Sequence, residues 1–292
     1  MNQIGTNLSS TYTLYNGVQI PCIGFGTWKM PDEVVDEAVY HAINCGYRHI
    51  DTAAAYFNEI GVGRGLKKVN IAREDVFVTS KLPNADHGYK KTLLSFEESL
   101  KRLQMDYLDL YLIHWPVIEE HKDHYEEDIL DTWRAFEKLY EEGKIRAIGV
   151  SNFMENHLEI LMQQGRIKPM VNQIQFNPQC VEEELRAYCY RHKIQIEAWS
   201  PLIQGQAFEH QILIDMAEKY QKTIAQICIR FALQNSVIPI PKSSQKERIA
   251  NNADVFDFNI TDEDMQQIAT LKSFGRVGDA PDVPRKFQVV GF

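Results

Sequence analysis

The sequence predicts a (β/α)8 barrel of the TIM type that is preceded by a β-hairpin. Eight short apolar strand patterns recur along the 292 residues, and helical patterns separate them at the spacing of repeated βα units. No Gly/Ser-rich linker, low-complexity segment or long charge run interrupts this order, so we expect one domain over residues 1–292. An open, doubly wound sheet is the alternative, because periodicity does not show whether a sheet closes on itself.

The predicted strands begin with the hairpin, "TYTLYNGVQIP" at residues 11–21. It alternates around Asn16-Gly17, a dipeptide that tolerates the positive φ angles of a two-residue turn. The eight barrel strands then follow in chain order, at residues 22–27 and near Arg48, Phe77, Leu110, Ala147, Val171, Ile196 and Ile238.

The predicted helices lie between these strands. The first runs over residues 32–45, with Asp32 as a candidate N-cap and Gly46 as its stop. From Tyr89 onward, and again over residues 133–143, apolar residues recur at spacings of three and four, as in amphipathic helices. Helices over 183–193 and 223–234 precede the last two strands. "GVGRG" at 61–65 lacks the spacing of a dinucleotide-binding loop and follows no strand, so we expect a closely packed helix there.

The composition limits the class of protein. Hydrophobic content of 44% and charged content of 24% are typical of globular chains, and no apolar run approaches the ~20 residues of a membrane span. The start, "MNQIGTNLSS", lacks the basic and apolar regions of a secretory signal, so we expect a cytoplasmic protein without a membrane partner. The net charge of −9 argues against nucleic acid as a partner. Five cysteines without a CxxC pair indicate reduced core thiols and no metal site.

Ionisable residues stand at the ends of three neighbouring strands. Asp51, Lys81 and His114 end the second, third and fourth strands, and Tyr56 lies in the loop after the second. Each has a purely structural explanation when taken alone, but in a barrel these ends share one rim. Burying a lysine and an aspartate is costly unless they pair, so we expect an Asp51–Lys81 pair beside Tyr56. Such an ammonium would lower the pKa of the phenol and make proton donation at neutral pH feasible.

Seven separated motifs cover nearly the whole chain. They are "GFGTW" (24–28), "GYRHIDTA" (46–53), "TSK" (79–81), "LDLYLIHWP" (108–116), "GVSNF" (149–153), "NQIQFNP" (172–178) and "PKSSQKERIANN" (241–252). In this order they resemble the aldo-keto reductase family. Closest in character are its bacterial reductases of glyoxal, methylglyoxal or diketo-gluconate and its prostaglandin F synthase-like members.

The resemblance implies an NADPH-dependent oxidoreductase that reduces aldehydes, α-dicarbonyls and some ketones to alcohols by hydride transfer. Tyr56 would protonate the developing alkoxide, Asp51 and Lys81 would tune Tyr56, and His114 would orient the carbonyl oxygen. Phe57 is expected to narrow the entrance, since many relatives have a smaller residue there. The substrate-binding residues implied are Trp28, Tyr56, Phe57, His114, Trp115 and Phe153.

The resemblance also implies contacts with NADPH or NADP+. Trp199 matches the ring that stacks on the nicotinamide, where many relatives carry Tyr and where Trp keeps a flat π face. Lys242, Ser243 and Arg248 match the group that binds the 2′-phosphate, whereas Asn251 departs from the glutamate common at its position. The complete set of implied cofactor contacts is Gly26, Thr27, Asp51, Ser151, Asn152, Gln173, Trp199, Ser200, Leu202, Lys242, Ser243, Arg248 and Asn252.

Two other functions fit parts of the sequence. A cofactor-binding regulatory or sensory barrel with little turnover would keep the same motifs. A metal-dependent barrel hydrolase would need ligands such as Asp51 and His114, but the charge of Lys81 would compete with a metal. His121 and His124 have a chelating spacing, yet their polar flanks favour a solvated loop. A small-molecule carbonyl is the expected partner of a chain that is a monomer or a weak dimer.

Overall fold

The computed structural model describes residues 5–284, and its main feature is a sheet of eight parallel strands that neighbour one another in chain order. The predicted strand count is therefore confirmed, although the first strand is shorter than expected. The strands are β3 (Phe25–Gly26), β4 (His49–Asp51), β5 (Phe77–Leu82), β6 (Leu108–Ile113), β7 (Ile145–Ser151), β8 (Val171–Gln175), β9 (Gln195–Trp199) and β10 (Ile238–Pro239).

Backbone hydrogen bonds join the first and the last of these strands. The amide of Gly24 donates to the carbonyl oxygen of Pro239 at 2.9 Å, and the amide of Gly26 donates to that of Pro241 at 3.0 Å. These contacts close the sheet, so the barrel is confirmed and the open doubly wound sheet is excluded. Closure brings the carboxyl ends of all eight strands to one rim.

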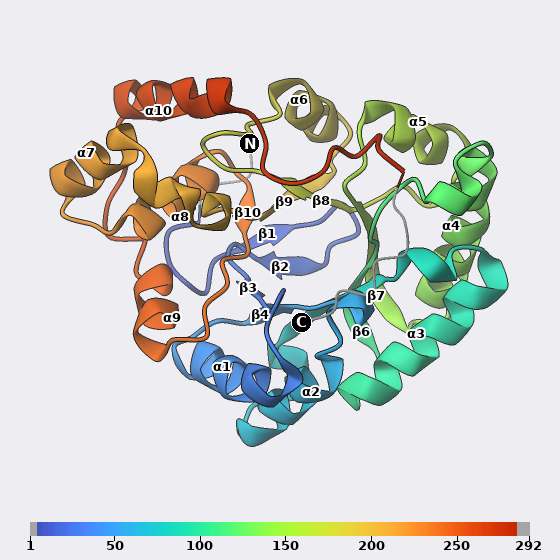
Figure 1. Cartoon of the computed structure of the whole chain (residues 1–292). Coiled ribbons are helices and arrows are strands. Elements are labelled where there is room, and N and C mark those ends of the chain that lie inside the picture. The colour runs from blue at the N-terminus through green and yellow to red at the C-terminus, as the bar shows by residue number, and fades with distance from the viewer. Residues whose placement is uncertain (1–4, 285–292) are drawn as a thin grey trace.

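Helices surround the barrel in a ring (Figure 1). Those in the described residues are α1 (Asp32–Asn44), α2 (Glu59–Lys68), α3 (Tyr89–Leu103), α4 (Tyr125–Glu141), α5 (Glu155–Gln164), α6 (Glu183–Arg191), α7 (Gln211–Tyr220), α8 (Ile224–Gln234), α9 (Lys246–Ala253) and α10 (Asp262–Ala269). The prediction of Asp32 as an N-cap is wrong, because Pro31 occupies that position. The Asp32 carboxylate instead accepts hydrogen bonds from the Gly61 amide at 2.6 Å and from Arg64 at 2.8 Å.

The predicted hairpin, β1 (Thr11–Thr13) paired with β2 (Gln19–Pro21), covers the opposite end of the barrel. Its turn differs from the predicted two-residue one, because the Leu14 amide donates to the Val18 carbonyl oxygen across three residues and Gly17 alone has a positive φ angle, at 90°. The Asn16 side chain donates to the carbonyl oxygen of Arg146 at the start of β7, and the Tyr15 hydroxyl donates to that of Lys168 just before β8. Because these contacts lie at the amino ends of the strands, the hairpin leaves the rim at their carboxyl ends uncovered.

Helix α2 packs closely against its neighbours, as predicted for "GVGRG". A Cβ atom at Gly61 would overlap the carbonyl oxygen of Asp32 in α1, and one at Gly63 would overlap that of Leu103 in α3. The glycines therefore permit backbone approaches that no larger residue allows. This segment positions the loop that carries Tyr56, because α2 begins three residues after it.

The structure bears on the expectations about cysteines and membrane spans, but it does not test the expectation of a single domain. All five cysteines are free thiols, and four of them are buried. None of the helices in residues 5–284 combines the length and the apolar character that a membrane crossing requires. That one domain spans residues 1–292 stays a prediction.

We predict that Gly61→Ala destabilises the fold by ~1–3 kcal/mol, because the added methyl group forces α1 and α2 apart. Urea unfolding would measure the loss. Ile60→Ala is the matched control on the same helix, since the Ile60 side chain is 46% exposed, and it should change stability by less than about 0.5 kcal/mol. Equal midpoints for both variants would contradict the close packing.

Candidate active site

Four predicted side chains meet at the rim. Asp51 ends β4, Lys81 lies in β5, His114 directly follows β6, and Tyr56 ends a short 3₁₀ helix, Ala54–Tyr56. The rings of Tyr56 and His114 are nearly perpendicular, with centroids 5.7 Å apart, and the Lys81 Nζ lies 5.0 Å from the Tyr56 ring centroid. The structure therefore brings together the groups that the strand ends predicted. Their catalytic roles stay a prediction.

The Asp51–Lys81 ion pair is present, as expected. Lys81 Nζ donates to both carboxylate oxygens of Asp51, at 2.7 and 2.8 Å, and to the carbonyl oxygen of Thr52 at 3.0 Å. Burial acts to lower the pKa of Lys81, but the attraction of Asp51 and Tyr56 outweighs it and raises this pKa above its usual value. Lys81 therefore stays charged although its side chain is only 1% exposed.

The expected lowering of the Tyr56 pKa is wrong. Burial of the phenol raises its pKa, the charge of Lys81 lowers it, and the charge of Asp51 raises it again. The net direction is upward, because desolvation and Asp51 together outweigh the ammonium. Tyr56 is consequently a phenol at neutral pH and holds a proton that it can donate, but it is a weaker acid than the sequence suggested.

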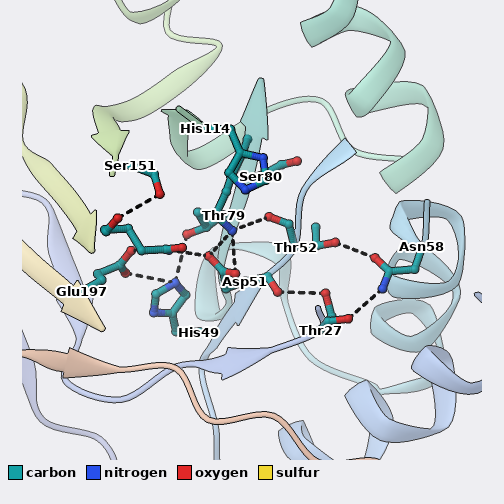
Figure 2. Close-up of polar contacts among 12 residues, drawn as sticks. Thr27, His49, Asp51, Thr52, Asn58, Thr79, Ser80, His114, Ser151 and Glu197 are labelled. Atoms are coloured by element: carbon teal, nitrogen blue, oxygen red, sulfur yellow. Dashed lines mark hydrogen bonds and ion pairs between the residues drawn. The ribbon is translucent and has the colours of Figure 1, made fainter. Parts of the chain in front are cut away.

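A set of hydrogen bonds fixes the loop that follows β4 (Figure 2). The backbone amide and the hydroxyl of Thr27 both donate to the carbonyl oxygen of Asp51, at 3.1 and 3.0 Å. The Asn58 side chain accepts from the Thr52 hydroxyl at 2.8 Å and donates to the Thr27 carbonyl oxygen at 2.9 Å. Sequence reasoning missed Asn58, whose fully buried amide gave no signal beyond its nearness to Tyr56.

Asn152 connects the other side of the rim. Its φ angle is 63°, in the left-handed region, and its amide donates to the carbonyl oxygen of His114 at 3.0 Å and to the Ser151 hydroxyl at 3.1 Å. The indole N–H of Trp199 donates to the Asn152 Oδ1 at 2.8 Å. A Tyr side chain at position 199 would have no ring N–H. Trp199 therefore ties its aromatic ring to Asn152, which in turn binds the His114 backbone.

Three further buried residues lie beside Asp51 inside the barrel: Gln173, Glu197 and His49. Gln173 Nε2 donates to the Asp51 Oδ2 at 2.8 Å and to the Glu197 Oε2 at 2.9 Å. Burial, followed by the charge of Asp51, raises the pKa of Glu197 to about 8. Burial, followed by the charge of Lys81, lowers the pKa of His49 to about 3. Sequence reasoning missed Glu197 and His49, although a carboxyl within the apolar strand "IQIEAW" was a usable signal.

The predicted substrate-binding aromatics differ in accessibility. The side chains of Trp28 and Phe57 are 38% and 54% exposed, and Phe57 is held at a φ of 55°. Trp115 is half-buried. Phe153 is fully buried in the core, with its ring against His157, so the structure does not place it among the exposed aromatic side chains.

A cavity of about 620 Å³ holds the predicted phosphate-binding group. Lys242 and Arg248 face it, and neither pairs with a carboxylate among residues 5–284. Partial burial and the nearby Lys29 lower the pKa of Lys242, so an anion would relieve an unfavourable charge there. The lining residues are Leu202, Phe208, Thr223, Ala225, Lys242, Ser243, Ser244, Gln245, Arg248, Asn251 and Asn252. Phe208, Thr223, Ala225, Ser244 and Gln245 were not predicted.

Eight predicted cofactor contacts lie outside this lining: Thr27, Asp51, Ser151, Asn152, Gln173, Trp199, Gly26 and Ser200. Gly26 leads toward it, because its amide binds the carbonyl oxygen of Pro241. Ser200 follows β9 with a φ of 49° and begins the turn toward Leu202. Both therefore stand on the backbone between the rim and the cavity.

In the loop with His121 and His124, His124 is exposed, as expected of a solvated loop, whereas His121 is partly buried. His121 Nδ1 lies 2.9 Å from one carboxylate oxygen of Asp128, and His87 Nδ1 lies 2.7 Å from the other. The described part of the chain contains no group of three or more side chains placed to hold a metal ion. Asp128 thus holds this loop against α4.

Comparison with known proteins decides the family. The model of the Aldo/keto reductase family matches residues 22–273. The chain belongs to this family. Both the predicted resemblance and the predicted enzyme class, an oxidoreductase, are therefore confirmed.

Relatives of this aldo-keto reductase match along their full length. The chain is 53% identical to the glyoxal reductase of Bacillus subtilis over 95% of its own length and 98% of that protein. It is 44% identical to the methylglyoxal reductase DkgA of Escherichia coli, over 92% and 96%. The structure of the Bombyx mori aldo-keto reductase AKR2E4 in complex with NADP superposes with a TM-score of 0.86 at 36% identity, over 94% and 96% of the two chains.

We predict that Lys81→Met destabilises this aldo-keto reductase by ~3–5 kcal/mol, because it leaves the Asp51 carboxylate buried and unpaired. The double variant that adds Asp51→Asn should recover most of the loss, since it removes that charge as well. Urea unfolding would measure both. Lys67→Met, at an exposed position of α2, is the matched control. A double variant no more stable than the single one would argue against the ion pair as the cause.

Proposed function

We propose that this protein reduces aldehydes and α-dicarbonyls, such as glyoxal and methylglyoxal, and some ketones, with Tyr56 as the general acid. The observation that carries the proposal is the buried Asp51–Lys81 pair, whose ammonium lies against the Tyr56 ring while His114 faces the same ring. These groups are fixed before any substrate arrives, as stabilisation of a developing charge requires.

NADPH is the cofactor, which when bound supplies a hydride to the carbonyl carbon. The residues of the chain fit it, because the cavity beside α9 offers two cations without carboxylate partners among the described residues. Lys242, Ser243 and Arg248 would hold the 2′-phosphate, and Trp199 would present its ring to the nicotinamide. The NADP complex of the Bombyx mori relative supports this assignment.

The proposed proton transfer uses the groups at the rim. Tyr56 keeps its proton at neutral pH and gives it to the carbonyl oxygen as negative charge develops there. The phenolate left behind is stabilised by the Lys81 ammonium, which Asp51 holds in place. His114 would orient the carbonyl oxygen toward the Tyr56 hydroxyl.

Small, reactive carbonyls are the proposed substrates. Exposed Trp28 and Phe57 stand on loops next to β3 and β4, and the backbone at Phe57 is left-handed. A ring at this position would restrict bulky substrates. The likeness to the glyoxal and methylglyoxal reductases supports the same class. We further propose a cytoplasmic protein that acts as a monomer or weak dimer and has no nucleic-acid or membrane partner.

We predict that the wild-type protein oxidises NADPH with glyoxal, methylglyoxal and small aldehydes, and that Tyr56→Phe lowers kcat by ~100-fold or more while NADPH still binds. A panel of carbonyls, followed by NADPH absorbance, and a fluorescence titration of NADPH would measure the two effects. Tyr40→Phe, on the outer helix α1, is the matched control. NADPH binding without turnover in the wild type would favour the regulatory or sensory function instead.

We predict that Arg248→Ala weakens NADPH binding by roughly tenfold, because it removes a charge-assisted contact to the 2′-phosphate, and leaves NADH binding nearly unchanged. Kd values for both cofactors would test this. Lys246→Ala removes a cation from the same helix, α9, but from outside the cavity lining, and serves as the control. An equal loss for NADPH and NADH would contradict phosphate recognition by Arg248.

A further inference from the structure

A second carboxyl group lies behind Asp51 in the barrel interior. Glu197 extends from β9, is fully buried, and shares the amide group of Gln173 with Asp51. Figure 2 shows Glu197 and His49 facing each other on the side of Asp51 away from Asn58. The chain therefore places two carboxyl groups on one donor inside a closed barrel.

The contacts of Glu197 favour a neutral acid. Its Oε2 accepts from Gln173, but its Oε1 has no hydrogen-bond partner and lies 3.6 Å from the His49 Nε2. The nearest ammonium, that of Lys81, is held by both oxygens of Asp51. His49 Nε2 is hydrogen-bonded to the Thr79 hydroxyl at 2.9 Å, and the neutral imidazole offers Glu197 no cation. A buried carboxylate without a cation of its own is costly, so the neutral acid is favoured.

We propose that Glu197 is a positioning residue of the reductase site, which as a neutral carboxylic acid holds Asp51 through Gln173 and weakens proton donation by Tyr56 when it ionises. The proposal rests on the proposed function. Gln173 is the only link that the described residues show between the two carboxyl groups, and Asp51 fixes the ammonium that lies against Tyr56. A change of charge at Glu197 thus reaches the proton donor through two hydrogen bonds and one ion pair.

The charged surroundings set the direction of the effect. The titratable groups that face Glu197 are His49 and Asp51 from β4 and Lys81 from β5, while β8 contributes the neutral Gln173 and β10 apolar residues. His49 is neutral, because burial and Lys81 lower its pKa to about 3. An ionised Glu197 would add a second negative charge beside Asp51, raise the pKa of Tyr56 further and make it a weaker acid.

The stability of the protein reports the protonation of Glu197 without any assay of turnover. The pKa of Glu197 in the folded state is about 8, above that of a free carboxyl group. The stability that this raised pKa provides is present at low pH and is lost as pH rises toward about 8. Glu197→Gln removes the titrating group, so its urea midpoint relative to wild type should rise between about pH 5 and about pH 9.

Glu59→Gln is the matched control for this measurement. Glu59 is equally buried, but its carboxylate accepts from Arg102 and from the Ser80 hydroxyl, both at 2.6 Å. It has the cation that Glu197 lacks. The midpoint of the Glu59→Gln variant should therefore lie below that of wild type by an amount that does not grow over the same range.

The kinetic test uses methylglyoxal reduction with NADPH. The ratio of kcat/KM for Glu197→Gln to wild type should be near one at about pH 7 and should rise several-fold by about pH 9, because the variant cannot ionise there. Glu197→Leu lacks an acceptor for Gln173 and should lower kcat about tenfold at neutral pH with little change in KM. The Gln variant, which keeps an acceptor, should restore kcat.

Three results would overturn the proposal or part of it. If the difference in urea midpoint between Glu197→Gln and wild type does not change with pH, Glu197 is not a neutral acid. A flat kinetic ratio together with a normal kcat for Glu197→Leu removes the positioning role. Absence of carbonyl reduction by the wild type refutes the proposed function and the positioning role with it, but a growing midpoint difference would still establish the buried neutral acid.

Discussion

The buried ion pair between Lys81 and Asp51 is the interaction on which the rest of the site depends. Both charges are buried inside the closed barrel, so each must be satisfied by the other and by fixed dipoles. Lys81 Nζ donates to Asp51 and to the Thr52 carbonyl oxygen. These contacts hold β4 and β5 in one register. That register positions the loop after β4, and this loop places Tyr56 against the Lys81 ammonium.

The same constraint explains why the barrel interior is polar at this level. The interior of such barrels is usually filled by branched apolar side chains. Here His49, Gln173 and Glu197 occupy it, and their polar atoms bond one another, Asp51 and the Thr79 hydroxyl. A network of this kind admits few alternative arrangements, because each member that moves leaves a buried group unpaired. The unpartnered atoms of His49 and Glu197 mark where it is least satisfied.

Particular residues show what the sequence could predict. The alternation of strands and helices located Asp51, Lys81 and His114 at strand ends, and those ends meet because parallel strands share a direction. Closure of the barrel depends on backbone contact between Gly24 and Pro239, which lie far apart in the sequence. The periodicity of apolar residues carries no information about such a long-range contact. The Tyr56 pKa was predicted in the wrong direction because desolvation depends on every atom packed around the hydroxyl, whereas the sequence revealed only the nearby charge.

Charge is divided unequally between the two parts of the site. At the rim, Lys81 is fully paired and the local ionic interactions are complete without any ligand. In the cavity beside α9, Lys242 and Arg248 have no carboxylate partner among the described residues, although the whole chain carries a net charge of −9. An anionic ligand is therefore drawn to the cavity and not to the rim. This asymmetry would orient a long cofactor by its phosphate and leave the preorganised end free for the carbonyl.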